Sequence, residues 1–129
     1  MKEFRVIVGN RPGELARVAE SLGREGVNLK SISATAGGNQ VTVHFIGHDV
    51  EAIRAGLNNM RAQFKEQEVL TLLLEDGAGE LANVLNKMGD AGINLDAIYL
   101  TGKAEDLIEI AVAVDDVKKA KKLLEDQMT

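Results

Sequence analysis

Hydrophobic residues follow two spacings along the chain, and the changes between them outline short strands and helices. Apolar residues alternate with other residues over positions 4–8 and 41–45, which predicts strands with one buried face. Between these runs, apolar residues recur at i, i+3, i+4 and i+7, as they do on one face of a helix. The predicted buried stripe of this helix consists of Leu15, Val18, Ala19 and Leu22.

Turn-forming residues place the remaining elements of the first half. Gly26 is typical of a left-handed helix end, so a second strand is expected over residues 27–35. Residues 36–39 predict a hairpin turn. Asp49 is a typical N-cap for a second helix, and an extended segment follows over residues 63–69. The inner face of the second helix is predicted to hold Val50, Ile53, Leu57 and Met60.

The second half repeats the first. The segment Gly13-Glu14-Leu15-Ala16 recurs at positions 79–82, and Gly26-Val27-Asn28-Leu29 recurs as Gly-Ile-Asn-Leu at positions 92–95. Nine of the 17 positions that begin at Gly13 are identical to those 66 residues later, which indicates an internal duplication. A turn one residue longer is expected in the second hairpin, because the offset there becomes 67. The helical stripe of the second copy is Leu81, Val84, Leu85 and Met88.

This order of elements predicts an α+β fold made of two ferredoxin-like βαββαβ repeats, residues 1–66 and 67–129. Only five residues follow Leu124, so the second repeat is expected to lack its last strand. A missing edge strand exposes backbone groups of its neighbour, and proteins usually cover such edges. We therefore expect a homodimer or a higher homo-oligomer.

Composition narrows the classes of partner. The 129 residues include no cysteine, and this absence excludes disulfides and thiol catalysis. The net charge of the chain is −5. Residues 1–66 hold 9 Lys and Arg against 7 Asp and Glu, whereas residues 67–129 hold 6 against 13. An acidic chain with one Tyr and three Phe lacks the basic, aromatic surface of nucleic-acid-binding proteins. No apolar run approaches the roughly 20 residues of a membrane span. These features predict a cytoplasmic protein without a nucleic-acid or membrane partner.

The sequence contains no catalytic motif. It has no nucleophile elbow, phosphate-binding loop or helical metal motif. His44 and His48 are the only histidines, and their spacing suits a metal on a helix but not at a strand end. Solvent-facing or capping roles are favoured for both. We therefore predict that the protein is not an enzyme and uses no cofactor or metal.

The two repeated motifs resemble the signature of the ACT domain family. Asn10-Arg11-Pro12-Gly13 and the later Gly26-Val27-Asn28-Leu29 match its Asp/Asn-x-Pro-Gly and Gly-hydrophobic-Asn-Ile/Leu segments. The second copy has Ala78 at the proline position. ACT domains are small βαββαβ modules that bind amino acids and regulate metabolic enzymes. Serine-sensing ACT modules of phosphoglycerate dehydrogenase also carry a histidine where this chain has Val8.

The resemblance implies ligand-binding residues in both repeats. ACT domains hold ligands between the first strand–helix loop of one module and the Asn-bearing second strand, often that of a neighbouring module. Carried over to this chain, the candidates of the first repeat are Asn10, Arg11, Pro12, Gly13, Asn28 and Leu29. Those of the second repeat are Asp76, Gly77, Ala78, Gly79, Asn94 and Leu95.

The chemistry of these residues suits an amino acid. The N–H groups that open a helix suit a carboxylate, and glycine lets a ligand approach the backbone closely. An Asn amide both donates and accepts, and Asp76 offers the ammonium group a charged partner. Structural roles remain open: Asn10 and Asp76 are also typical helix caps, and Pro12 suits a first helical turn. The two motif asparagines, Asn28 and Asn94, also suit bonds to local backbone.

These observations predict a small-molecule sensor, most simply for an amino acid, that acts through module and subunit interfaces. One alternative is a regulatory subunit of a separate biosynthetic enzyme, similar to the small subunit of acetohydroxyacid synthase. Another is a structural dimerisation module that binds no ligand. Gly23 and Gly89, which interrupt the two helical patterns, are predicted to allow close helix packing.

Overall fold

The computed structural model describes all 129 residues. They form two compact units, Met1–Gln67 and Glu68–Thr129. Each unit has its own core of buried apolar side chains, so each is described by itself.

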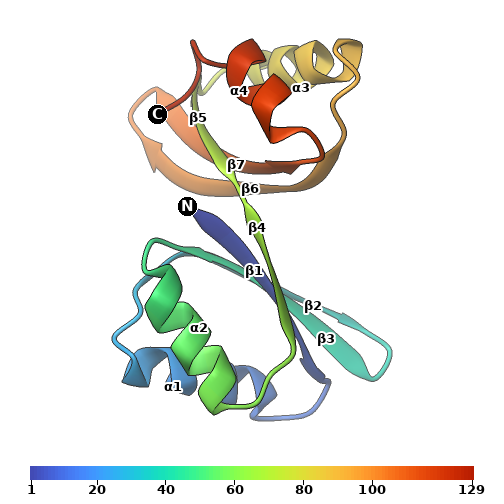
Figure 1. Cartoon of the computed structure of the whole chain (residues 1–129). Helices are drawn as coiled ribbons and strands as arrows, with labels where there is room; N and C mark the ends of the chain where they lie inside the picture. Colours follow the sequence, from blue (N-terminus) through green and yellow to red (C-terminus); the bar gives the residue numbers. More distant parts are fainter. The chain divides into compact units, whose positions relative to one another are not determined.

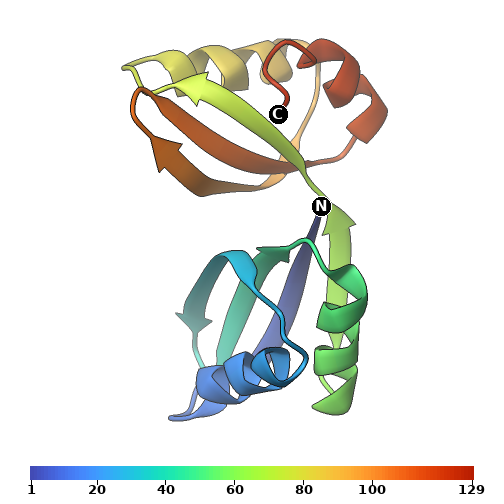
Figure 2. The ribbon, with the colours of Figure 1, turned by 90° about the vertical axis from the view of Figure 1, so that its left-hand side faces the viewer.

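The first unit is a four-stranded sheet with two helices on one face (Figure 1, Figure 2). The strand order is β2-β3-β1-β4, and the central strand β3 pairs antiparallel with both β1 and β2. This is the predicted ferredoxin-like arrangement. The elements are β1 (Lys2–Gly9), α1 (Glu14–Arg24), β2 (Leu29–Gly37), β3 (Gln40–Gly47), α2 (Val50–Asn59) and β4 (Phe64–Glu68).

The second unit repeats this order with a three-stranded sheet, β5-β7-β6, which confirms that it has no full fourth strand. The residues after the last helix nevertheless pair with the edge of β5. The Leu73 N–H donates to the Gln127 carbonyl (2.7 Å), and the Thr129 N–H donates to the Thr71 carbonyl (3.1 Å). The expected free edge is therefore partly occupied. The elements are β5 (Leu70–Glu75), α3 (Glu80–Asp90), β6 (Leu95–Ala104), β7 (Leu107–Val114) and α4 (Val117–Leu123).

The extra residue of the second repeat lies in a strand and not in the turn. Both hairpins have two-residue turns, because Gly37 pairs with Gln40 and Ala104 pairs with Leu107. The register of β6 shifts between Leu100 and Gly102, so Thr101 is the inserted residue of a β-bulge. Its hydroxyl donates to the Glu109 carboxylate across the sheet (2.8 Å). The prediction of a longer turn is wrong, because a bulge absorbs one residue without changing the turn.

The buried stripe predicted for α1 is only partly correct. Val18 and Leu22 are buried, but Leu15 is 43% exposed and Ala19 is also exposed. The buried face of α1 also includes Ser21, whose hydroxyl donates to the Gly56 carbonyl of α2 (2.6 Å). This contact joins α1 to α2. In α3, Val84 and Met88 are likewise buried, and Leu81 is 40% exposed.

The close helix contact lies at a different glycine from the two predicted. A Cβ atom on Gly23 or Gly89 would have no atom within 4 Å, so the prediction of close packing there is wrong within each unit. A Cβ atom on Gly56 would lie 3.1 Å from the Ser21 carbonyl oxygen. Gly56 therefore lets α2 approach α1.

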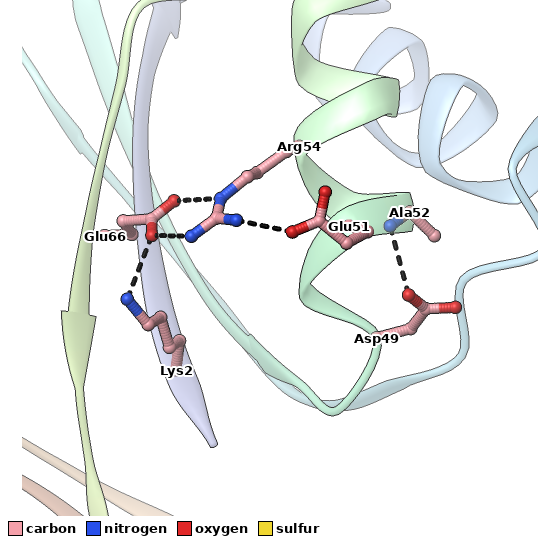
Figure 3. A network of polar contacts seen from close by, with 6 residues as sticks. All are labelled: Lys2, Asp49, Glu51, Ala52, Arg54 and Glu66. Carbon is pink, nitrogen blue, oxygen red and sulfur yellow. Dashed lines mark hydrogen bonds and ion pairs between the residues drawn. The ribbon is translucent and has the colours of Figure 1, made fainter.

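A network of charges joins β1, β4 and α2 in the first unit (Figure 3). The Glu66 carboxylate accepts hydrogen bonds from the Arg54 Nε (2.8 Å) and the Lys2 Nζ (3.0 Å). The bond from Arg54, followed by that from Lys2, lowers the pKa of Glu66 to about 2. At the start of α2, the Asp49 carboxylate accepts from the Ala52 N–H (3.1 Å), which confirms the predicted N-cap.

Candidate functional site

The loop between β1 and α1 ends at a glycine that exposes helical N–H groups. Gly13 occupies the N-cap position with φ of 87°, and no side chain caps the helix. A left-handed backbone here favours glycine because it has no Cβ atom. The first-turn N–H groups of Leu15 and Ala16 have no hydrogen-bond partner in the protein. These two groups are donors that a ligand can use.

The second repeat builds the same loop. Gly79 is the N-cap of α3 with φ of 87°, again without a side-chain cap. The N–H groups of Leu81 and Ala82 have no partner in the protein. The two helix starts, which open segments with 9 of 17 identical residues, therefore expose the same pair of donors.

The residues before these glycines are not helix caps. α1 begins at Glu14, so Pro12 lies in the turn before the helix and not in its first turn. Asn10 is tied to the β2–β3 hairpin: its side-chain amide donates to the Gly38 carbonyl (3.0 Å), and its N–H donates to Asn39 (2.9 Å). The capping interpretation of Asn10 is therefore wrong, and its side-chain oxygen has no partner in the protein.

Asp76, the counterpart of Asn10, is also tied to a hairpin. Its N–H donates to the Asp106 carbonyl (2.6 Å), and its carboxylate lies 2.8 Å from the Lys103 ammonium. The hydrogen bond and charge of Asp76 raise the pKa of Lys103. Asp76 does not cap α3, because Gly79 occupies the N-cap position. The carboxylate predicted to receive a ligand's ammonium is thus held by an internal cation.

Charge distinguishes the two loops. In the first, Glu14 accepts hydrogen bonds from Arg11 (2.7 Å) and Arg17 (3.1 Å), and these bonds lower the pKa of Glu14. Two guanidinium groups thus share one carboxylate beside the exposed N–H groups. The second repeat has Gly77 and Asn83 at the arginine positions, so its loop contains no arginine. Pro12, Gly77 and Ala78 are all exposed.

Asn28 and Asn94 lie far from the loop of their own unit. β1 and β2 run in the same direction, and the register places Leu29 beside Gly47, which pairs with Lys2 at the start of β1. The loop follows Gly9 at the other end, seven residues along the strand. At about 3.3 Å per residue, the two groups are about 23 Å apart. One unit therefore does not bring Asn28 together with Asn10 or Gly13.

The neighbouring motif residues have structural surroundings. Leu29 and Leu95 are half-buried and pack against the cores of their units. The side-chain amides of Asn28 and Asn94 make no hydrogen bond within the protein. The local-backbone role considered for these amides is therefore not seen.

Two surface hollows lie outside the predicted loops. One, of about 830 Å³, covers the face of the first sheet that carries Ile7, Thr42 and His44. The other, of about 400 Å³, lies in the second unit beside α3 and includes Lys87 and Gln127. Sequence reasoning missed both, because the residues that line each hollow come from segments far apart in the chain that share no motif.

The structure was also searched for groups of metal-binding side chains and for helices that could cross a membrane. No group of three or more His, Cys, Asp or Glu residues is arranged to hold a metal ion. His44 lies with its Nδ1 3.6 Å from the Glu3 carboxylate, on the sheet face away from the helices. None of the helices is both long and apolar enough to cross a bilayer.

Comparisons with known proteins give the fold. No model of a known protein family matches the chain, and no curated protein shows significant sequence similarity to it. Among solved structures, protein BT0572 from Bacteroides thetaiotaomicron is similar with a TM-score of 0.89 at 18% identity, over 99% of this chain and 90% of that one. The ligand-free regulatory subunit of aspartate kinase from Thermus thermophilus is similar with a TM-score of 0.71 at 14% identity, over 98% and 91%.

A third similar structure is the regulatory subunit of aspartate kinase from Thermus flavus, with a TM-score of 0.59 at 16% identity over 97% and 91% of the two chains. At these identities the likeness concerns the fold. The chain thus consists of two ACT-like units, a complete βαββαβ unit and a second unit that lacks the full last strand, the fold that its duplicated loop motifs implied.

Proposed function

We propose that the protein is a regulatory sensor that binds a small amino acid at its glycine-opened loops. The observation that carries this proposal is the pair of uncapped helix starts, where the N–H groups of Leu15 and Ala16, and of Leu81 and Ala82, have no internal partner. Such groups bind carboxylates, because the positive end of the helix dipole adds to the hydrogen bonds. The fold likeness to regulatory subunits of aspartate kinase supports a regulatory role over an enzymatic one.

The first loop is the better site for the carboxylate. Arg11 and Arg17 add positive charge there, and Gly13 leaves open space in which a ligand reaches the backbone. The free side-chain oxygen of Asn10 accepts a hydrogen bond from the ligand's ammonium group. In the second loop the ligand's ammonium competes with Lys103 for Asp76. We therefore expect the first loop to bind more tightly.

A second copy of the chain completes the site in this proposal. Asn28 lies about 23 Å from the loop of its own unit, so it serves a ligand held by the loop of another module. The edge strands β2 and β6 favour such an assembly, because they carry exposed apolar side chains: Ile32 is 48% exposed and Leu100 is 62% exposed. Sedimentation at tens of micromolar protein is expected to detect a dimer or larger oligomer. A monomer would contradict this part of the proposal.

Calorimetric titration of the full chain against the twenty amino acids tests ligand binding. Two variants of the first loop separate charge from backbone strain. Gly13→Asp places a carboxylate where the ligand's carboxylate would lie, whereas Gly13→Asn has a similar shape and tolerates the same left-handed backbone. We expect the Asp variant to bind at least about tenfold more weakly than the Asn variant.

The same titration separates the sensor from a structural module. Binding at 100 times the dissociation constant stabilises a protein by about 2.7 kcal/mol, which thermal unfolding detects. An absence of heat and of stabilisation with every amino acid would support the structural alternative.

A second candidate function is that of a regulatory subunit for a separate metabolic enzyme. The observation that favours it is the likeness to a structure of aspartokinase alpha and beta subunits, with a TM-score of 0.64 at 14% identity. Co-purification from native extract tests this candidate, because a regulatory subunit remains bound to a larger catalytic chain. If the chain is recovered alone and still binds an amino acid, the result contradicts this candidate and favours a sensor that acts without a bound enzyme.

A further inference from the structure

The wider of the two hollows, of about 830 Å³, lies on the first sheet. All of its lining residues belong to the first unit. Ligand pockets in proteins measure about 300–1,000 Å³, so this hollow has room for a small organic molecule. None of its lining residues is Asp or Glu, whereas Arg5, His44 and Lys65 are basic. The hollow is therefore lined by positive and neutral groups alone.

Strand alternation brings the basic residues to one face of the sheet. In β1 the core residues alternate with Arg5 and Ile7, which therefore lie on the side away from the helices. Arg5 is the cross-strand partner of His44 in β3. In β4, Phe64 packs against the core, so its neighbour Lys65 lies on the same side as Arg5. Three strands thus supply one basic residue each.

A buried carboxylate holds two of these groups in place. Glu3 is 1% exposed, and its Oε1 atom accepts a hydrogen bond from the Arg5 Nε atom (2.9 Å). Its Oε2 atom lies 3.6 Å from the Nδ1 atom of His44. A second bond runs from the Arg5 Nη2 atom to the Gln67 Oε1 atom (3.5 Å). A guanidinium group has five N–H donors, so these two bonds fix Arg5 and leave three donors for a ligand.

The charge of the hollow indicates what such a ligand carries. Arg5 balances the charge of Glu3. Lys65 is exposed and makes no ion pair, so its ammonium group keeps the hollow positive. The planar fork of an arginine matches carboxylate and phosphate oxygens, and hydrogen bonds between charged partners are the strong ones. These features suit an anion.

The second repeat shows that the fold does not require the charged groups. Its residues at the positions of Glu3, Arg5 and His44 are Val69, Thr71 and Ala111. The same face of the second sheet is therefore built without these charges. Apolar residues of similar volume are often as stabilising as a buried ion pair. A ligand that uses the groups of the first unit accounts for their presence where stability does not.

We propose that this hollow binds a small organic anion, a carboxylate or phosphate group attached to a short hydrocarbon chain. The anionic oxygens accept hydrogen bonds from the free N–H groups of Arg5 and pair with the Lys65 ammonium group. The hydrocarbon part packs on Ile7, which is 57% exposed and lies two residues, or about 7 Å, along β1 from Arg5. The site uses no residue of the glycine loops, so it goes beyond the sensor function proposed above.

Titration of the full chain with butyrate and with butyl phosphate, followed by ¹H–¹⁵N NMR, tests this site. We expect saturable shifts of the backbone amides of Ile7, Thr42 and Lys65 with at least one of the two anions, and the one that binds more tightly identifies the anionic group. Butanol and butylammonium have a similar hydrocarbon chain without negative charge and should cause no such shifts. The amides of Leu15 and Ala16 report on the first glycine loop in the same spectra, which separates binding there from binding in the hollow.

Variants at the hollow make the test specific. Lys65→Met removes an exposed charge and is expected to weaken anion binding about three- to fivefold. The double variant Glu3→Val, Arg5→Thr copies the second repeat and removes the guanidinium group without leaving a buried carboxylate unpaired. It is expected to weaken binding at least about tenfold. Lys118→Met removes an exposed lysine of the second unit that also makes no ion pair, and as the matched control it leaves the affinity unchanged.

Thermal unfolding verifies that each variant is folded. Because Lys65 is exposed, its variant tests the site independently of any loss of stability in the double variant. Shifts confined to the loop amides, equal shifts with butanol, the absence of saturation, or unchanged affinity in both variants of the hollow would overturn the proposal.

Discussion

Gly47 and Ile53 fit together as a small residue beneath a large one: a Cβ atom on Gly47 would lie 2.7 Å from the Cδ1 atom of Ile53. The second repeat reverses the sizes, with Val114 and Ala120 at the equivalent positions. All four residues are buried. Both repeats therefore fill the same part of the core, between the end of a strand and the following helix, with different pairs of side chains.

This exchange predicts that the two positions are coupled. Ile53→Ala alone leaves a cavity and is expected to lower the free energy of unfolding by about 2–5 kcal/mol. Gly47→Val alone overpacks the site and is expected to lower it by about 1–3 kcal/mol. The double variant reproduces the second repeat's pair, so its loss should be smaller than the sum of the two. Urea denaturation of the four proteins measures the coupling, and strict additivity would contradict it.

Acid is expected to remove the stabilisation provided by Glu66. The pKa of this carboxyl is about 2 in the folded protein, below its ordinary value of 4.5, chiefly because Arg54 donates to it. A lowered folded-state pKa contributes stability that is present above the ordinary value and is lost as pH falls toward 2. The stability difference between wild type and Glu66→Gln should therefore be constant above about pH 5 and shrink from there down to pH 2.

Urea denaturation at several pH values measures this difference. Glu20→Gln is the control for the loss of one negative charge, because Glu20 lies on the exposed side of α1, 3.8 Å from Arg24. A difference that stays the same from pH 6 to pH 2 would show that the network around Glu66 does not stabilise the folded state.

Removing Lys103 is expected to strengthen ligand binding at the second loop. Its ammonium occupies the Asp76 carboxylate at 2.8 Å, so a ligand's ammonium must displace it. Lys103→Met keeps most of the side chain and removes the charge. Exposed ion pairs are weak, so the gain in affinity should reach at most about fivefold. Calorimetry with an amino acid that binds wild type measures it. Unchanged affinity at the second site would show that Asp76 does not contact the ligand.

Gly23→Ala is expected to stabilise the protein. Gly23 lies inside α1 with open space around it and without a left-handed backbone, so alanine fits there. Alanine in a helix interior is favoured over glycine by about 0.4–1 kcal/mol. Gly13→Ala is the matched contrast, because its φ of 87° strains any residue with a Cβ atom and should lower stability. Thermal unfolding compares them. A stable Gly23→Ala variant that no longer assembles would instead place α1 in the oligomer interface.

The sequence predicted the elements well where one local rule decided them. Asp49 caps α2 as expected, and Asp116, at the equivalent position of the second repeat, caps α4 in the same way, since an acidic side chain before an apolar helical pattern has one favourable position. Gly26 and Gly92 have the left-handed backbone predicted for helix ends. The duplication itself predicted that both halves share a fold, because two copies of one pattern bury the same faces.

The candidate site was harder to predict, because its residues depend on contacts far along the chain. Asn10 bonds to Gly38 and Asp76 to Lys103, and neither pairing follows from spacing. Both residues were therefore plausible helix caps until the hairpins were placed. Thr101 shows the same limit, because a bulge and a longer turn give the same sequence offset.

What the sequence determined by itself was the repeated order of strands and helices and the glycines that begin and end the helices, since hydrophobic spacing and backbone sterics act over a few residues. Only the tertiary structure decided that Asn28 lies at the opposite end of the sheet from Gly13 and that the absence of a side chain at Gly56 lets α2 approach α1. It also decided that a hollow lies beside Gln127. These features depend on the direction of strands and on the volume of side chains that meet from distant positions, which no local pattern records.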